Sequence, residues 1–129
     1  MTDLSPTAPL VLIVDDDVEL CTLLDRVLTS EGFQVKTMYH GQPALDWLSS
    51  HTPDAIVLDI MMPDIDGFEL LSKVRGIHVG GEMPVIMLSA RMNQQAIEDS
   101  QRLGADAWLS KTEGVRQLVT ELKERLARH

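Results

Sequence analysis

Five short apolar runs alternate with segments of helical periodicity along this chain, and this alternation limits the possible fold more than any other feature. The runs occupy residues 10–14, 34–39, 55–58, 85–88 and 107–109. After the first run, apolar side chains recur with helical spacing at Leu20, Leu23, Leu24, Val27 and Leu28, and Ser30, Glu31 and Gly32 end that helix. A strand followed by a helix, repeated five times, predicts an α/β domain with a parallel sheet and helices on both faces.

The composition of the runs predicts their places in the sheet. Residues 10–14, 55–58 and 85–88 are apolar throughout, as in strands covered on both faces. The run 34–39 alternates polar and apolar residues and the run 107–109 is short, so we place both at the edges. Further helices are expected near 42–50, 67–75 and 93–103, and over the stripe from Val115 to Leu126. We expect a flexible tail over residues 1–9 and one domain over residues 10–129.

The charge balance disfavours several classes of partner. The formal net charge is −9, from 20 acidic against 11 basic residues. We therefore expect no direct binding to nucleic acid or to a membrane, since nucleic acid and anionic lipid both require a positive surface. The single cysteine, Cys21, is expected to be a partly exposed packing residue and is typical of a reducing cytoplasm. The N-terminus has no signal-peptide pattern and no run is long enough to span a bilayer, so we expect a cytoplasmic location.

Polar side chains follow four of the five runs, at the point where each predicted strand ends. They are Asp15, Asp16 and Asp17 after the first run, Asp59 after the third, Ser89 after the fourth, and Ser110 and Lys111 after the fifth. Any one of them has an ordinary explanation, because an aspartate before a helix can simply cap it. Ligands of open α/β sheets bind at the carboxyl ends of the strands, so we expect these side chains to converge there.

The types of these residues indicate the chemistry of the expected site. Clustered carboxylates repel one another and are tolerated when a divalent cation lies among them. Oxygen ligands without histidine or cysteine favour a hard cation such as Mg²⁺, which leaves coordination positions for phosphate oxygens. A lysine is suited to a phosphoryl group. A carboxylate nucleophile, Mg²⁺ and a lysine together make a phosphoryl-transfer site.

Four motifs, VLIVDDD, VLDIMMPDIDG, VIMLSA and LGADAWLSK, resemble the receiver domain of two-component response regulators, including the chemotaxis regulators. The similarity extends from residue 10 to residue 128. It implies a three-layer flavodoxin-like (βα)5 fold with strand order 2-1-3-4-5, which agrees with the edge positions expected above. It also implies a phosphorylated signalling protein and not a turnover enzyme, either monomeric or a weak dimer when phosphorylated.

The resemblance implies a role for each polar residue. Asp59 would be the phosphoacceptor, taking a phosphoryl group from a phosphohistidine of a histidine kinase or phosphotransfer protein. Asp16 and Asp59 would bind Mg²⁺ directly, Asp15 would help through water, and the backbone carbonyl of Met61 would complete the protein's ligands. Lys111 would pair with the phosphoryl group.

The resemblance also implies a switch. The hydroxyl of Ser89 would move toward the attached phosphoryl group, and Trp108, at a position where the family usually has Tyr or Phe, would turn inward. That movement would change the face formed by the fourth helix, fifth strand and fifth helix, and so control a downstream protein target. Ordinary packing is the alternative for Trp108. Met61 and Arg91, two residues beyond Asp59 and Ser89, are expected to tune the lifetime of the phosphoryl group.

One departure and two alternative functions remain open. Thr112 follows Lys111, where the family usually has proline after a cis peptide bond; a cis bond before another residue costs about 3–4 kcal/mol. The bond is therefore either trans or held cis under strain. A haloacid-dehalogenase-type phosphatase uses similar groups, but its signature requires Thr or Val where this chain has Glu19. A receiver-like binding module without phosphorylation is the second alternative, and only Thr112 favours it.

Overall fold

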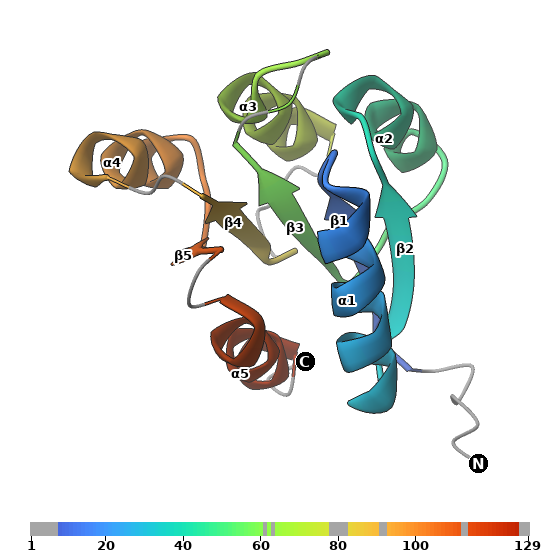
Figure 1. Cartoon of the computed structure of the whole chain (residues 1–129). Coiled ribbons are helices and arrows are strands. Elements are labelled where there is room, and N and C mark those ends of the chain that lie inside the picture. The colour runs from blue at the N-terminus through green and yellow to red at the C-terminus, as the bar shows by residue number, and fades with distance from the viewer. Residues whose placement is uncertain are drawn as a thin grey trace.

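Five strands and five helices alternate along the chain in a computed structural model that describes residues 8–60, 62, 64–77, 83–90, 93–111 and 114–126 (Figure 1). In chain order they are β1 (Leu10–Val14), α1 (Val18–Ser30), β2 (Gln34–Met38), α2 (Gly41–Leu48), β3 (Ala55–Asp59), α3 (Gly67–Ile77), β4 (Val85–Ser89), α4 (Gln94–Arg102), β5 (Ala107–Ser110) and α5 (Gly114–Leu126). The predicted alternation of strands and helices is confirmed. None of the helices within the described ranges has the length and apolar character needed to cross a bilayer.

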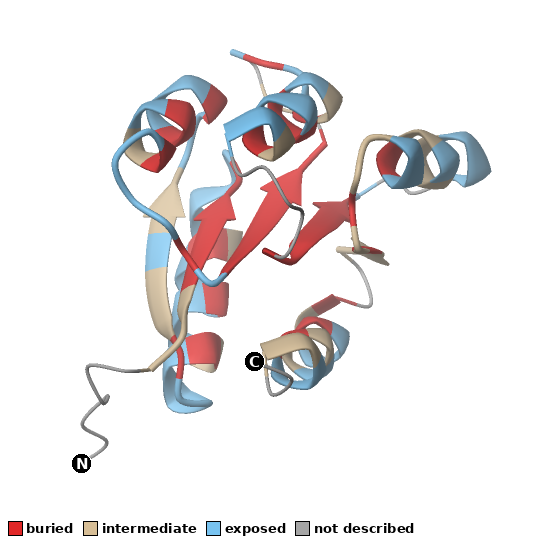
Figure 2. Ribbon diagram, turned by 180° about the vertical axis from the view of Figure 1, so that it is seen from behind, coloured by how far each residue is buried: buried red, intermediate tan, exposed pale blue. Residues whose placement is uncertain are grey.

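The strands form one parallel sheet in the order β2-β1-β3-β4-β5, which confirms the predicted flavodoxin-like order. The expected edge strands are the half-buried ones, because β2 and all but the first residue of β5 retain partial exposure. The three central strands are almost wholly buried, as Figure 2 shows in red. The apolar and alternating runs of the sequence therefore correspond to position in the sheet.

Helices cover both faces of the sheet, giving the three predicted layers (Figure 1). Successive residues of a strand point to opposite faces, so each central strand supplies both cores. The core under α1 and α5 contains Val11, Ile13, Val57, Ile86, Leu88, Cys21, Leu24, Leu28, Leu118 and Leu122. The core under α2 and α3 contains Leu12, Val14, Ile56, Leu58, Val85, Met87, Ala44, Leu45, Leu48, Leu70, Leu71 and Val74.

The buried face of α1 differs from the expected one. Cys21 is fully buried, so the prediction of a partly exposed cysteine is wrong, and Leu23, predicted to face inward, is 47% exposed. The physical reason is the helical phase. The face that meets the sheet is centred on Leu24, with Cys21 and Leu28 one turn to either side, and Leu23 lies about 100° away from that centre.

Candidate functional site

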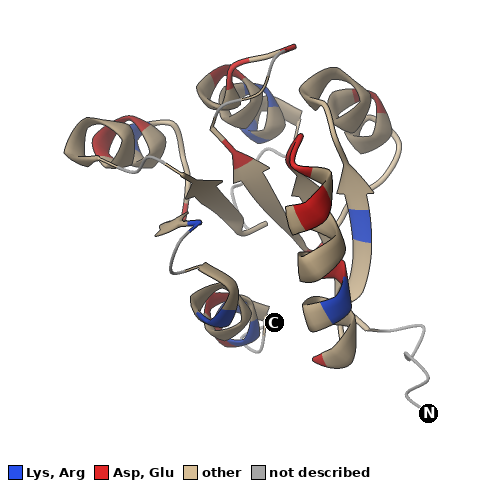
Figure 3. Cartoon of the chain, viewed as in Figure 1, with Lys and Arg blue, Asp and Glu red and all other residues tan. Residues whose placement is uncertain are grey.

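The carboxyl ends of β1 and β3 bring three aspartates together. Val14 pairs with Leu58 across these two strands, so the next residues, Asp15 and Asp59, leave the sheet side by side. One carboxylate oxygen from each of Asp15, Asp16 and Asp59 lies within 4.8 Å of the others. Asp15 and Asp59 are buried, whereas Asp16 is exposed. Figure 3 shows these acidic positions, in red, at the end of β3 and where β1 leads into α1.

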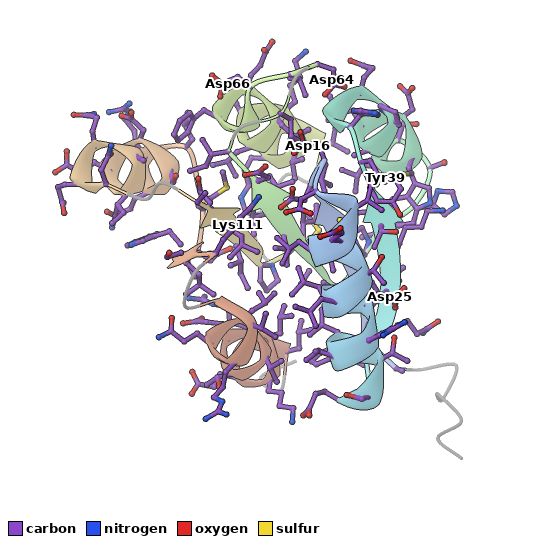
Figure 4. All side chains as sticks on the ribbon, viewed as in Figure 1. Asp16, Asp25, Tyr39, Asp64, Asp66 and Lys111 are labelled. Carbon is purple, nitrogen blue, oxygen red and sulfur yellow. The ribbon has the colours of Figure 1, made fainter. Side chains whose placement is uncertain are left out.

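The three adjacent aspartates after β1 have different local structures. One oxygen of Asp15 accepts a hydrogen bond from the backbone N–H of Asp17 at 2.9 Å, which closes the turn. Asp17 is the N-cap of α1, and its carboxylate accepts from the N–H of Leu20 at 3.0 Å. Asp16 lies between them and, like Asp17, is exposed to solvent (Figure 4). Capping thus accounts for Asp17 and leaves Asp15 and Asp16 for the cluster.

Lys111 brings a positive charge to the cluster from the end of β5. Its backbone N–H donates to the carbonyl of Ser89 at 2.9 Å, which extends the pairing of β4 with β5 to this residue. Its Nζ lies 2.9 Å from Oδ2 of Asp15 and 3.4 Å from Oδ2 of Asp59. Figure 4 shows the side chain reaching from β5 toward the end of β3. The structure thus brings Asp15, Asp16, Asp59 and Lys111 to one edge of the sheet.

The environment of Lys111 maintains its charge. Burial of the ammonium acts to lower its pKa, but the hydrogen bond and the negative charge of Asp15, together with the charge of Asp59, raise the pKa above its ordinary value of 10.5. Lys111 is therefore a cation at neutral pH. A fixed ammonium beside two buried carboxylates can stabilise negative charge that arrives on a ligand.

One oxygen of the cluster is not fully satisfied. Oδ2 of Asp15 is buried, and the described group that it contacts is Nζ of Lys111 at 2.9 Å, an ammonium that it shares with Asp59. Among the described residues, three carboxylates gather here and one ammonium contacts two of them, so negative charge is in excess within that set. A buried oxygen in this state favours an additional cation. Because the three side chains of the cluster offer only oxygen ligands, they fit Mg²⁺.

Ser89 lies next to this cluster in the sheet, and Trp108 lies on the neighbouring strand β5, two residues before the strand ends. Asp59 is level with Leu88 on β4, so Ser89 is one position further toward the carboxyl edge, and its side chain is buried. Trp108 is level with Met87 and packs, half-buried, against the core under α2 and α3. The packing interpretation of Trp108 thus describes this conformation, and a change of conformation is required for the switch interpretation.

Three residues named in the sequence analysis lie outside the described residues: Met61, Arg91 and Thr112. The Met61 carbonyl as a metal ligand and the tuning roles of Met61 and Arg91 therefore stay predictions. The geometry of the bond between Lys111 and Thr112 also stays open.

A groove beside the aspartate cluster was not predicted. It has a volume of about 720 Å³. Acidic and apolar side chains line it: Asp16, Asp64, Asp66 and Glu69, with Ile60, Met62, Ile65 and Phe68. Asp64 carries a further contact that was missed, because its carboxylate accepts hydrogen bonds from the first two backbone N–H groups of α2. The sequence signal for it was the absence of Ser, Thr, Asp or Asn at position 40, immediately before that helix, since His40 caps poorly.

Comparison with known proteins agrees with this arrangement. The family model of the response regulator receiver domain matches residues 11–123. Regulatory protein VanRc of Enterococcus gallinarum is 35% identical over 119 residues, which are 92% of this chain and 50% of VanRc. The chain therefore spans about half the length of that relative.

Solved structures give the same result. A CheY-like response regulator receiver domain protein from Methanospirillum hungatei JF-1 superimposes with a TM-score of 0.87 at 28% identity, covering 95% of this chain and 96% of that one. A two-component response regulator from Clostridium difficile has a TM-score of 0.87 at 27% identity, with 93% and 97% covered.

Proposed function

The chain belongs to the response regulator receiver domain family, and from this premise we propose that it is a phosphorylation-dependent switch with Asp59 as its phosphoacceptor. Receiver domains are signalling modules of two-component systems. The observation that carries the proposal is the contact of Lys111 with Asp15 at 2.9 Å and with Asp59 at 3.4 Å. It provides an acceptor carboxylate and a cation for the phosphoryl oxygens at one edge of the sheet.

In the proposed reaction, a carboxylate oxygen of Asp59 attacks the phosphorus of a phosphohistidine on a histidine kinase or phosphotransfer protein. The new O–P bond forms as the N–P bond breaks, and the imidazole leaves with the bonding electron pair. Lys111, oriented by Asp15, meets the negative charge of the transferred group. Most of the catalysis is therefore positioning and charge neutralisation by groups already in place.

The proposal includes Mg²⁺ as cofactor. Asp16 and Asp59 would hold it directly, Asp15 would assist through water, and the backbone carbonyl of Met61 would complete the set. When bound, the ion would neutralise the carboxylates and coordinate phosphoryl oxygens. The excess negative charge of the cluster and the buried Oδ2 of Asp15 support this assignment.

The proposal extends to the output. After phosphorylation the hydroxyl of Ser89 would turn toward the phosphoryl group and Trp108 would turn inward, which would change the face of α4, β5 and α5 that a downstream protein contacts. The position of Ser89 one residue beyond the level of Asp59 supports the first step. Met61 and Arg91 would set the lifetime of the phosphoryl group.

The test is incubation of the chain with Mg²⁺ and acetyl phosphate, followed by intact mass measurement. We expect one phosphoryl adduct that survives acid, is lost in base, and is absent in Asp59→Asn. Asp25→Asn is the matched control, because Asp25 is an exposed aspartate on α1, away from the cluster (Figure 4).

An adduct that persists in Asp59→Asn would overturn the proposal. So would the absence of an adduct with both acetyl phosphate and phosphorylated histidine kinases. Turnover of a generic phosphatase substrate would favour the phosphatase alternative.

A further inference from the structure

The start of α2 is capped from a distant part of the chain. His40 occupies the N-cap position and makes no side-chain cap hydrogen bond. Instead, the carboxylate of Asp64, in the loop between β3 and α3, accepts from the N–H of Gly41 at 3.0 Å and from the N–H of Gln42 at 2.9 Å. A carboxylate is favoured there because a helix N-terminus presents unpaired N–H groups and partial positive charge. Asp64 therefore anchors its own loop on α2.

Ile65, the next residue of the loop, also lies against Gly41. A Cβ atom at position 41 would lie 1.8 Å from Cγ2 of Ile65, so a side chain there would displace the isoleucine. Ile65 is itself buried in the core under α2 and α3. The loop and the first residue of α2 thus meet at a close contact that requires glycine, next to the two hydrogen bonds of Asp64.

The base of the same loop is closed as well. The N–H of Gly67 donates to the carbonyl of Ile60 at 2.9 Å. A Cβ at Gly67 would lie 2.4 Å from the carbonyl oxygen of Asp59, so the chain returns against the backbone of the phosphoacceptor itself. The described contacts of this loop are therefore the bond between Ile60 and Gly67 at its base and the bonds of Asp64 to α2. In sequence, Met61 lies within this loop.

We propose that Asp64 is a positioning residue for the phosphorylation site: by anchoring the loop between β3 and α3 on the start of α2, it supports the Mg²⁺ site that we propose around Asp59. This inference rests on the proposed function, since it concerns the same site. The Asp64 side chain is exposed, so the anchor depends on hydrogen bonds to a carboxylate and not on burial. The hydrogen bond from Gln42, and to a lesser degree the one from Gly41, lower the pKa of Asp64. Asp64 is therefore a charged carboxylate at neutral pH and can accept both hydrogen bonds.

The test is Mg²⁺ binding measured by isothermal titration calorimetry on wild type and Asp64→Ala. We expect affinity to fall about tenfold in Asp64→Ala, as when a group that supports a metal ligand is removed. Glu69→Ala is the matched control. It removes the same charge from the same groove, but Glu69 is exposed and its contact is an ion pair with Lys73 at 3.6 Å. We expect it to change affinity by less than about twofold.

A second measurement tests the anchor directly. Amide hydrogen exchange at Gly41 and Gln42 should become faster in Asp64→Ala, and in wild type it should slow when Mg²⁺ binds. Asp64→Asn should fall between, because its amide offers one acceptor oxygen and turns an NH₂ group toward the other N–H.

The outcomes distinguish failure of the inference about Asp64 from failure of the proposed function. Equal losses of affinity in Asp64→Ala and Glu69→Ala would mean that charge alone acts, and would overturn the inference while the proposed function stands. Unchanged exchange at Gly41 and Gln42 in Asp64→Ala would overturn it too. A wild-type chain that binds no Mg²⁺ would overturn the proposed function and this inference with it.

Discussion

The two ends of the sheet carry polar clusters of opposite character. At the amino ends of β4 and β5, Arg75 donates to the carbonyls of Gly104 and Met83 and to the carboxylate of Asp106, at 2.9, 2.7 and 2.7 Å. The same Asp106 oxygen accepts from the N–H of Val85 at 2.8 Å. At the carboxyl ends, Asp15, Asp16 and Asp59 gather beside the ammonium of Lys111, which lies 2.9 Å from Asp15 and 3.4 Å from Asp59, so among the described residues three carboxylates face one ammonium.

The difference separates a polar cluster whose charges are paired from one with excess negative charge. In the Arg75 cluster, one positive charge meets one carboxylate and the remaining donors reach backbone oxygens, so the group ties α3 to the starts of β4 and β5. The aspartate cluster is left with negative charge that the described residues do not balance, which favours a bound cation. A polar network that is complete stabilises the fold, and one that is incomplete leaves free energy available for a ligand.

The largest effect on stability is expected from Arg75→Met. This substitution removes three hydrogen bonds and leaves the half-buried carboxylate of Asp106 without its cation, so we expect a loss of about 3 kcal/mol in the free energy of unfolding. Urea unfolding measures it. Mg²⁺ affinity should be unchanged, because the aspartate cluster is at the opposite end of the sheet from Arg75.

Arg102→Met is the control: its ion pair with Asp99 is on the surface and should contribute less than about 0.5 kcal/mol. Equal losses in the two variants would contradict the assignment.

A smaller and pH-dependent effect is expected from Lys111→Met. Without Mg²⁺ we expect a loss of about 1–2 kcal/mol, because two carboxylates lose a cation at an edge that solvent reaches through Asp16. The pKa of Lys111 is raised on folding, so its contribution is fully present below the ordinary value of 10.5 and is lost only as the pH rises through the higher folded-state value.

The difference in stability between wild type and Lys111→Met should therefore be constant around neutral pH and should disappear only in strong alkali. Urea unfolding over a pH series measures this. Lys73→Met, which removes an exposed partner of Glu69, is the control and should show less than about 0.5 kcal/mol at any pH. A difference that disappeared already near neutral pH would contradict the assignment.

The aspartate cluster was largely predictable from the sequence, and the Arg75 cluster was not. Asp15, Asp59 and Lys111 each directly follow or end a strand, and parallel strands bring their carboxyl ends to one edge. Arg75 and Asp106 are 31 residues apart, and no pattern of spacing connects the end of a helix with the residue before β5. Such contacts depend on tertiary packing, which local sequence does not encode.

Dependence on tertiary packing also explains the smaller differences between the sequence predictions and the structure. The sequence placed three aspartates after β1, but which of them caps α1 depends on the residue at which the helix begins, and that residue is Val18. The same phase buried Cys21 and exposed Leu23. The cap of α2 by Asp64 is a contact between the β3–α3 loop and the first residues of a distant helix, and the sequence indicates it only by a poor capping residue at His40.

The smallest effect, and the one of opposite sign, is expected from Asp16→Asn. Its carboxylate oxygen lies within 4.8 Å of those of Asp15 and Asp59, so its charge repels theirs when no cation is bound. Because Asp16 is exposed, solvent screens this repulsion, and we expect Asp16→Asn to increase the free energy of unfolding by only about 0.5–1 kcal/mol without Mg²⁺. Mg²⁺ affinity should fall at least about tenfold, because the substitution removes a proposed ligand.

The control for this prediction is Asp17→Asn, which removes the same charge from the next residue. Asparagine caps a helix about as well as aspartate, so the contact with the N–H of Leu20 is kept. We expect Mg²⁺ affinity within about twofold of wild type and no gain in stability, since Asp17 is not part of the carboxylate cluster. Urea unfolding with a chelator and calorimetric Mg²⁺ titration measure both quantities. If Asp16→Asn lowered stability as Arg75→Met does, the carboxyl end of the sheet would be a balanced structural cluster, and its excess charge would no longer argue for a bound cation.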